Sequence, residues 1–363
     1  MTVHEIGVRA AHAMLSLTLA VSAMTITVGG PTSALVQPVL ERVAMLNSKN
    51  GWAMTRQRLY RTQTGGRHWE ATGPSLPKSA TVYWQIASST ALWLAVVSPH
   101  ANLLYHTQNG GKRWQSLRLP SPKGALLTEI AFAKGRPGYA TYALSLSPSG
   151  ENLAIYSSSN QGRKWHLAPE PRLPTAGIKS GLVLGPGSTA WLAGGSATIG
   201  KIYLYRQSKP QTPWRPVAVA VPSLLKRALL WSTPPHFFGS QDGVLPVFIN
   251  GTEGDPLFYV TQNGGKTFSP GTPVVPLAAA GGWTLAEWKF INPRLGFAWL
   301  KPSPTNPQPA SALYRTTDGG IHWTKVATRP KLAKLRTLDL ISAKSGFAIP
   351  KQGRGLVPVG ILG

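Results

Sequence analysis

Three carboxylates are the residues of this 363-residue chain whose type and setting best fit catalysis. Glu129, Glu287 and Asp339 each lie inside a short apolar stretch that reads as a strand, namely LLTEIAF, LAEWKF and RTLDLI. Two carboxylates on either side of a glycosidic bond can act as acid and base, or as acid and nucleophile. If these strands line a common centre, the three residues are the catalytic candidates. The competing interpretation is structural, with the same residues paired inside that centre.

Thiol and metal chemistry find no support in the sequence. The chain has no cysteine, which excludes disulfides, thiolate ligands and a cysteine nucleophile. Its eight histidines form no His-x-His or His-x-x-x-His pair. We therefore expect neither a metal site nor a cofactor.

The charge is strongly positive. Lys and Arg number 37 against 12 Asp and Glu, for a formal charge of +25. Such an excess fits a basic surface adapted to acidic or anionic surroundings, or a site for a polyanion. The partner would then be a protein or an anionic envelope polymer. No recognition helix or RNP-type motif is visible, so we expect no specific nucleic-acid partner.

The N-terminal segment has the features of an export signal. Arg9 and His12 precede an apolar run at residues 13–28, and Gly29-Gly30-Pro31 ends it. The small residues at 32–34 suit signal-peptidase cleavage, so residues 1–34 are predicted to be a signal peptide and the protein to be secreted or extracytoplasmic. The alternative is an uncleaved membrane anchor, although sixteen apolar residues fall short of the roughly 20 that span a bilayer. Membrane contact is expected only through such an anchor.

A repeated line organises the rest of the chain. It reads YRTQTGGRHW at Tyr60, YHTQNGGKRW at Tyr105, YVTQNGGKTF at Tyr259 and YRTTDGGIHW at Tyr314. A variant copy follows Tyr156 and a degenerate one follows Tyr205, and successive tyrosines lie 45 to 55 residues apart. Upstream of each copy runs a Gly-aromatic-Ala strand such as NGWAM, PGYATYAL or LGFAWL.

Each unit of about 50 residues thus holds four short strands with a tight hairpin between the third and fourth. Four strands of this kind cannot bury both faces alone and must stack radially, which predicts a β-propeller. We expect an all-β fold of seven blades, or six, with residues 35–363 forming a single domain and acting as a monomer. Residues 33–40 are expected to supply an outer strand that closes the ring.

The repeated line encodes a turn that closes on itself. A hydroxyl or Asx side chain accepts hydrogen bonds from backbone amides, glycine takes a positive φ, and an aromatic residue anchors the turn to the sheet. The residues in these positions are Thr62, Gly66, Trp69, Thr107, Asn109, Gly111, Trp114, Ser158, Asn160, Gly162, Trp165, Thr261, Asn263, Gly265, Phe268, Thr316, Asp318, Gly320 and Trp323. Only Asp318 keeps an acid, and Thr64 is the poorest match. Acidic residues are missing even from turn positions where the motif has Asp. This indicates selection against acids along the whole chain, for example in acidic surroundings.

The line resembles the Asp-box, or BNR repeat, Ser/Thr-x-Asp-x-Gly-x-Thr-Trp. Asp-box propellers include sialidases, glucan-cleaving hydrolases and the photosystem II stability/assembly-factor-like family. The resemblance to the last covers nearly the whole mature chain, because it includes the Gly-aromatic-Ala strand, and residues 295–323 carry it best. It implies a non-enzymatic exported scaffold that binds protein partners without cofactors. The alternative is a divergent, sialidase-like glycoside hydrolase acting on extracellular glycans.

In a four-stranded blade, the loops between the second and third strands lie on the same face of the ring as the crossings between blades. Many of the cations fall in these segments and are therefore expected on that face. This candidate binding face contains Arg56, Arg58, Arg118, Arg172, Arg227, Lys334, Arg336 and Arg354. The opposite face, which carries the hairpin turns, is also basic. The sequence therefore leaves open whether the basic surface is a binding site or an environmental adaptation.

Overall fold

The computed structural model describes residues 38–133, 137–147, 150–168, 176–249, 255–275, 283–303, 311–328, 332, 334–352 and 356–360. The expected signal segment lies outside these residues. So do Arg172 and Arg354 of the candidate binding face.

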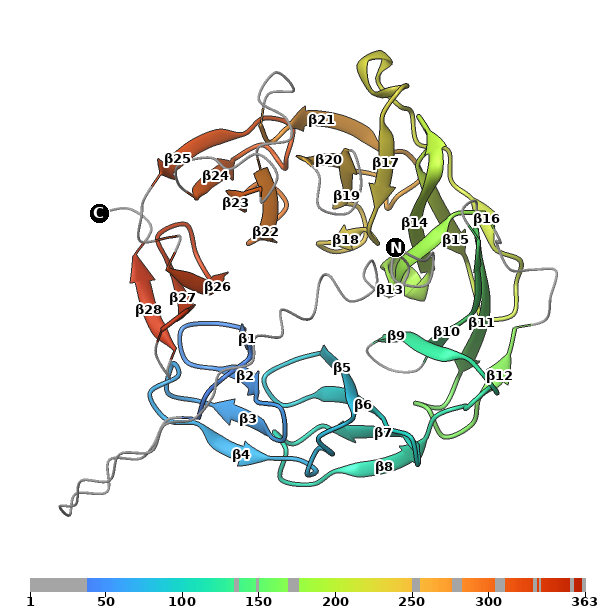
Figure 1. The fold of residues 1–363 in the computed structure, drawn as a ribbon, viewed down its shortest axis with the longest axis vertical. Helices are drawn as coiled ribbons and strands as arrows, with labels where there is room; N and C mark the ends of the chain where they lie inside the picture. The colour runs from blue at the N-terminus through green and yellow to red at the C-terminus, as the bar shows by residue number, and fades with distance from the viewer. Residues whose placement is uncertain are drawn as a thin grey trace.

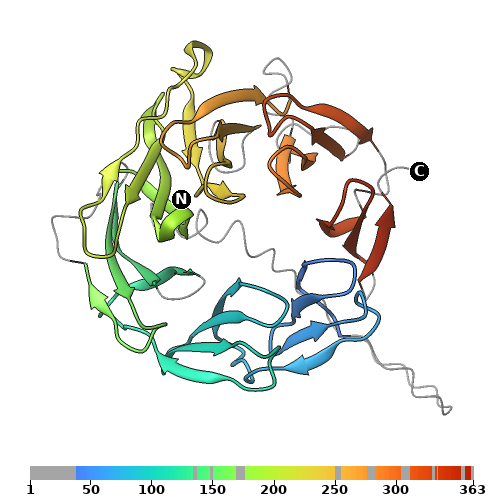
Figure 2. The same cartoon turned by 180° about the vertical axis from the view of Figure 1, so that it is seen from behind.

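Antiparallel sheets of short strands are arranged around a common axis (Figures 1 and 2). The strand nearest the axis comes first in each repeat and the outermost comes last. The inner strands are β1 (Arg42–Met45), β5 (Thr81–Ile86), β9 (Leu126–Phe132), β13 (Ile178–Leu184), β17 (Leu229–Ser232) with β18 (His236–Phe237), β22 (Trp283–Phe290) and β26 (Leu335–Leu340). The all-β, antiparallel prediction is confirmed.

The second and third strands are the two repeated lines found in the sequence. The Gly-aromatic-Ala line forms β2 (Gly51–Met54), β6 (Leu92–Val97), β10 (Gly138–Ser147), β14 (Ala190–Ile199), β19 (Gly243–Ile249), β23 (Gly296–Pro302) and β27 (Ser345–Pro350). The third strands, most of which end in the tyrosine line, are β3 (Leu59–Thr62), β7 (Asn102–Thr107), β11 (Gly150–Ser158), β15 (Tyr203–Gln207), β20 (Asp255–Thr261), β24 (Ala312–Thr316) and β28 (Val357–Gly360). Alanine lies opposite tyrosine in the pairs Ala53–Tyr60, Ala140–Tyr156 and Ala298–Tyr314. This small-to-large pairing recurs because the motif recurs.

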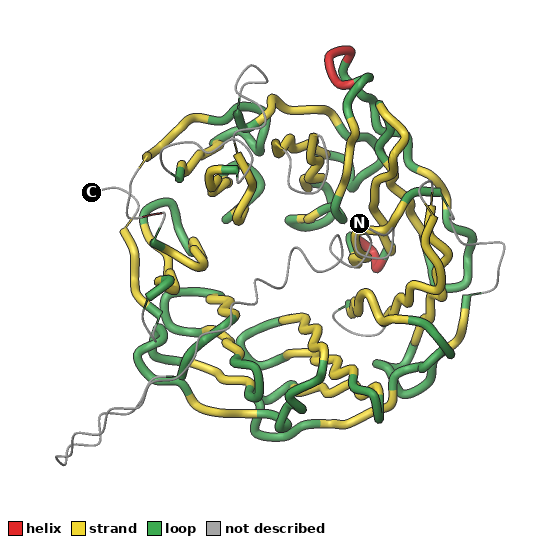
Figure 3. Tube along the Cα trace, viewed as in Figure 1, coloured by secondary structure: helices red, strands yellow, loops and turns green. Residues whose placement is uncertain are grey.

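The outer strands are short. They are β4 (Glu70–Thr72), β8 (Gln115–Arg118), β12 (His166–Leu167), β16 (Arg215–Pro216), β21 (Ser269–Pro273) and β25 (Thr324–Thr328). Two 3₁₀ turns, η1 (Pro186–Ser188) and η2 (Ser223–Leu225), interrupt the connections and stand out in Figure 3.

Most sheets have four strands, but two neighbouring units are joined into one sheet of nine. In it, β17 pairs with its own second strand β19 and also with β14 of the preceding unit. The last sheet contains three strands, β26-β27-β28.

Apolar clusters between successive sheets form the core, because both faces of each sheet are covered by a neighbour. Trp52 of β2 and Leu94 of β6, for example, belong to one cluster. The aromatic residues that end the six tyrosine lines lie in six different clusters: Trp69, Trp114, Trp165, Trp214, Phe268 and Trp323. Each turn therefore anchors a different contact between sheets.

The first and last sheets meet at a seam between β1 and β26. Leu40 is buried there among residues that include Phe347 and Ile349 of β27. Of the segment expected to add an outer strand, residues 33–37 lie outside the described residues, and residues 38–40 form no strand. At these three positions the chain closes the seam by packing Leu40 into the core.

Candidate functional site

The carboxylate of Asp339 binds the neighbouring sheet. Its Oδ2 atom accepts the backbone N–H of Met45, with an N···O distance of 2.5 Å, and so joins β26 to β1. Its Oδ1 atom forms an ion pair with Lys289 of β22. One side chain of β26 thus contacts strands of both neighbouring sheets, β1 and β22.

Glu287 makes the equivalent contact one sheet earlier. Its Oε2 atom accepts the backbone N–H of Leu338 at 2.7 Å, joining β22 to β26. Burial raises the pKa of Glu287 to about 7; the Leu338 N–H opposes this shift, while the nearby negative charge of Asp339 adds to it. Glu287 and Asp339 are therefore neighbours, as the catalytic hypothesis required of a pair.

Glu129 lies apart from these two. It is on β9, which Figure 1 places across the ring axis from β26. Burial raises the pKa of Glu129 to about 7, and its Oε1 atom accepts the N–H of Ile130 at 3.1 Å. The structure therefore brings two of the three catalytic candidates together and leaves the third on the other side of the ring.

Contacts from side chain to backbone between inner strands recur around the ring, and the sequence analysis missed most of them. The amide of Gln85 on β5 both accepts from Phe132 N (2.6 Å) and donates to Phe132 O (2.9 Å) on β9. Similar bonds run from Arg42 to the carbonyl of Val82 and from Ser180 to that of Ser232. Glu287 and Asp339 belong to this series. The signal that marks its members is a polar residue in an apolar first strand.

The hairpin turns have the bonding pattern that the motif predicts. In the second sheet, the Thr107 hydroxyl accepts the N–H of Gly111 at 3.0 Å, and Asn109 Oδ1 accepts the N–H of Arg113 at 2.9 Å. The hydroxyl also donates to Asn109 Oδ1. Equivalent bonds occur with Ser158, Asn160 and Gly162, with Thr261, Asn263 and Gly265, and with Thr316, Asp318 and Gly320. The hydroxyl and Asx side chains of these turns therefore form hydrogen bonds within their own turns.

Two weaker copies of the turn are also closed by side-chain hydrogen bonds. Thr62 accepts from Gly66 at 3.0 Å, and the Thr64 hydroxyl accepts from His68 N at 2.9 Å, so Thr64 takes the position of Asn109. In the degenerate copy the amide of Gln207 donates to Thr212 O at 2.7 Å. The motif undervalues the turn at Thr64, where a hydroxyl oxygen replaces the Asx acceptor, whereas in the degenerate copy Gln207 donates and the acceptor pattern is lost.

The one acid in these turns is held ionised. Partial burial disfavours the charged form of Asp318, but hydrogen bonds from His322 and Thr316 outweigh it and lower the pKa. The ring nitrogen of His322 lies 2.7 Å from Asp318 Oδ2. These contacts are local to the hairpin.

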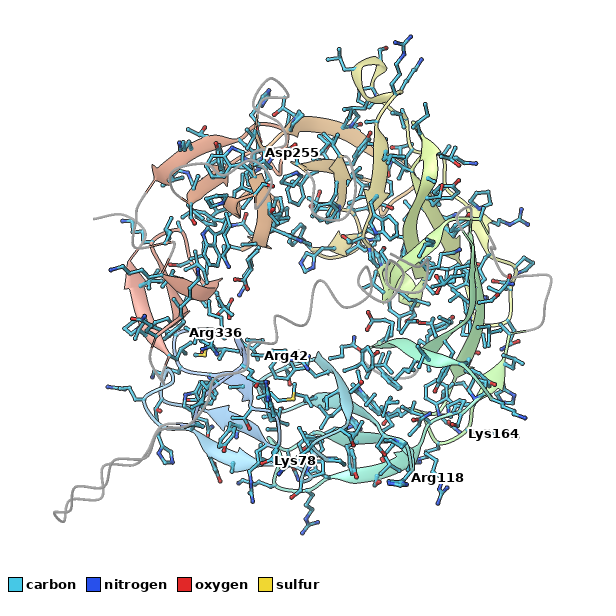
Figure 4. All side chains as sticks on the ribbon, viewed as in Figure 1. Arg42, Lys78, Arg118, Lys164, Asp255 and Arg336 are labelled. Atoms are coloured by element: carbon cyan, nitrogen blue, oxygen red, sulfur yellow. The ribbon has the colours of Figure 1, made fainter. Side chains whose placement is uncertain are left out.

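The described residues of the candidate binding face are spread over the ring. Arg58, Arg118, Arg227 and Lys334 are exposed, and exposed Arg56 pairs with Glu41 at 3.0 Å. Arg336 is half-buried and donates to the carbonyl of Leu40 at 3.1 Å. Figure 4 shows Arg118 at the outer edge and Arg336 close to the axis, so the residues do not converge on one point.

A tighter group of cations lies beside Glu287. Lys301 at the end of β23 stacks over Trp299, with its ammonium 4.2 Å from the ring centre. Burial lowers the pKa of Lys301, and the charge of Lys351 lowers it further, while Glu287 opposes the shift. The backbone N–H of Lys351 donates to Lys334 O at 2.7 Å, which brings the loop of Lys334 to the same place. We call Lys301, Lys334 and Lys351 the lysine cluster.

Other kinds of site are not indicated. Within the part of the chain that the structure describes, no three His, Asp or Glu residues are grouped as a metal site would need. No helix among the described residues is long and apolar enough to cross a membrane.

Comparison with solved structures identifies the fold. The chain is similar to YCF48 bound to a D1 peptide (TM-score 0.54, 18% identity, covering 89% of this chain and 92% of that one) and to YCF48 from Cyanidioschyzon merolae (TM-score 0.53, 16% identity, 89% and 95%). It is also similar to a GH74 xyloglucanase from Xanthomonas campestris (TM-score 0.58, 14% identity), of which it spans 55% while 90% of this chain is covered. No protein-family profile matches the chain, and neither does any curated protein. At these identities the likeness establishes the propeller fold alone, which the YCF48 structures and the xyloglucanase share.

Proposed function

We propose that this protein is a non-enzymatic, seven-bladed propeller that acts as a binding or assembly scaffold outside the cytoplasm. Seven apolar clusters are found among the described residues, one for each contact between successive repeats. The nine-stranded sheet counts as two blades joined through β14 and β17. The partner of the protein is an acidic protein segment or an anionic envelope polymer.

The observation that carries the proposal is the use of Glu287 and Asp339. Both accept backbone N–H groups of the next sheet, and Asp339 also holds Lys289. A catalytic carboxylate has to direct an oxygen at the substrate, whereas Oε2 of Glu287 and both oxygens of Asp339 bind groups of the protein itself. YCF48, which has the same fold, has been solved with a bound peptide.

The lysine cluster supports an anionic partner. Lys301 is made less basic by burial and by a like charge, so an incoming carboxylate restores the stability of its charged form. Exposed Lys351 lies close enough to lower the pKa of Lys301, and its backbone N–H binds the carbonyl of exposed Lys334, a residue of the candidate binding face. Binding there neutralises repulsion that the free protein retains.

The proposal is tested by capture of partners from the native envelope. The wild-type chain is compared with Lys301→Gln/Lys351→Gln and with Lys112→Gln/Lys164→Gln, which removes two exposed lysines from the hairpin turns. We expect a specific partner that the first variant loses and the second retains. Equal retention by both variants, or no salt-sensitive partner at all, contradicts the role of this face.

A hydrolase remains the second candidate, because Glu287 and Asp339 are close and one of them has a raised pKa. The triple variant Glu129→Gln/Glu287→Gln/Asp339→Asn distinguishes the hydrolase from the scaffold, because it removes all three candidate carboxylates. A glycosidase activity that is present in the wild type and lost in this folded variant supports the enzyme. Any such activity that survives the triple substitution excludes these carboxylates.

Export is part of the same proposal and rests on residues 1–34. The N-terminal sequence of the protein recovered from its native host tests it. A mature terminus near residue 35 supports a cleaved signal peptide. An intact terminus in the membrane fraction supports an anchor, and an intact terminus in the cytoplasm refutes export.

A further inference from the structure

One projection from the ring exposes apolar side chains to water. It consists of residues 199–201, at the end of β14, and residues 222–229, which include η2 and the start of β17; we call it the prong. Figures 1 and 3 show its η2 end beyond the outline of the ring. Ile199, Leu224 and Leu229 are 54%, 83% and 39% exposed, and Leu224 is the most exposed large apolar side chain among the described residues.

The exposure of Leu224 is fixed by the turn. The next residue, Leu225, is 4% exposed and packs into a core cluster. Its N–H donates to Pro222 O at 2.9 Å, and Ala228 N donates to Leu225 O at 3.0 Å. With Leu225 anchored inward, Leu224 is directed away from the protein.

The two halves of the prong hold each other in place. Gly200 N donates to Ala228 O at 2.8 Å. Gly200 has a φ of +63°, and a Cβ there would lie 2.4 Å from Lys226 O, so only glycine allows this approach. Ile199 is the cross-strand partner of Leu229, which places these two apolar side chains on the same face.

Cations flank these apolar residues. Lys201, Lys226 and Arg227 are exposed, and none takes part in a salt bridge among the described residues. The sequence from residue 171 to 241 contains no acid at all. The prong therefore has an apolar tip with an uncompensated positive base.

We propose that the prong inserts into the surface of an anionic bilayer, with Leu224 and Ile199 among the acyl chains and Lys226 and Arg227 at the phosphate level. Exposed aliphatic residues beside Lys and Arg are the features of interfacial membrane binding. A convex projection with three apolar side chains is too small for a stable protein interface, which buries about 1,200–2,000 Å². This inference goes beyond the scaffold function, and it differs from the expectation that only an N-terminal anchor contacts the membrane.

Site-specific fluorescence tests the inference in the full chain. Because the protein lacks cysteine, Leu224→Cys carries a single NBD fluorophore, and Leu167→Cys, at a 52% exposed leucine of β12, is the matched control. Vesicles of phosphatidylcholine, with and without phosphatidylglycerol, are added. We expect a blue shift, and quenching by nitroxide-labelled acyl chains, only for the label at 224 and only with phosphatidylglycerol. A label at 224 that stays in water on vesicle-bound protein, or equal responses at both sites, overturns the proposal.

Charge variants provide the second readout. Lys226→Gln/Arg227→Gln and Lys112→Gln/Arg113→Gln remove the same dipeptide charges from the prong and from a hairpin turn. The prong variant is expected to lose affinity for phosphatidylglycerol vesicles by roughly 30-fold, about fivefold for each cation near the surface. The control pair is expected to change it by less than about threefold, because its charges stay away from the bilayer. Equal losses in both pairs mean that net charge alone drives binding, and the prong has no special role.

Discussion

Replacement of Glu287 by glutamine isolates one contribution of pH to the stability of the ring. Glu287→Gln keeps the size of the side chain and an oxygen that accepts the Leu338 N–H, but it cannot ionise. In the folded protein, burial raises the carboxyl pKa from 4.5 to about 7. The variant therefore removes a titration while it leaves the contact between β22 and β26 in place.

The direction in which pH changes the stability follows from proton binding. Between pH 4.5 and 7 the folded protein holds a proton that the unfolded chain has released, so stability is full below pH 4.5 and falls as pH rises through 7. The interval from 4.5 to 7, at about 1.4 kcal/mol for each pKa unit, corresponds to a loss of up to about 3 kcal/mol. Glu287→Gln does not suffer this loss. It should exceed the wild type by less than about 1 kcal/mol at pH 5 and by about 3 kcal/mol at pH 8.

Urea unfolding followed by tryptophan fluorescence measures the difference at both pH values. Glu70→Gln, at an exposed glutamate, is the control and should give the same difference at pH 5 and pH 8. A Glu287→Gln difference that does not change with pH means that the carboxyl ionises equally in both states. A variant less stable than the wild type at pH 8 means that the negative charge itself is required. Either result refutes the reasoning.

Three further predictions concern the sheets and turns. Burial lowers the pKa of His106 to about 4, so wild-type stability is lost as pH falls from 6.5 to 4; His106→Phe should remove this loss of about 3 kcal/mol in acid-unfolding curves. Gly111→Ala should lower the free energy of unfolding by about 2 kcal/mol more than Gly124→Ala. Both glycines have positive φ, but only at Gly111 does a Cβ meet Thr72, at 1.9 Å, and equal melting temperatures would contradict this. Asp318→Asn should change the unfolding free energy by less than about 1 kcal/mol, because asparagine fills the same position in three other turns; a larger thermal shift would assign the carboxylate a role beyond the turn.

Much of the fold could be predicted because the repeat fixes local structure. The Gly-aromatic-Ala line and the tyrosine line became the second and third strands, as at Ala53 and Tyr60, since alternation and turn chemistry act over a few residues. The joining of β14 to β17 could not be predicted. It depends on a pairing between units, and no local pattern encodes such a pairing.

The candidate site was predictable only in part. A carboxylate in an apolar strand is noticeable in the sequence, which is how Glu287 and Asp339 were found. That their oxygens bind Leu338 N and Met45 N depends on which strand lies alongside, and so on the whole ring. The exposure of Leu224 was hidden for the same reason, because the adjacent and chemically identical Leu225 is the one that is buried.

The uneven way in which the blades are connected gives the ring an uneven stiffness. Backbone hydrogen bonds between β14 and β17 join two blades into one continuous sheet. At the seam, by contrast, β26 and β1 are joined through side chains such as Asp339 and Leu40. A load that widens the ring should therefore separate the junctions that side chains hold, the seam among them, before it separates β14 from β17.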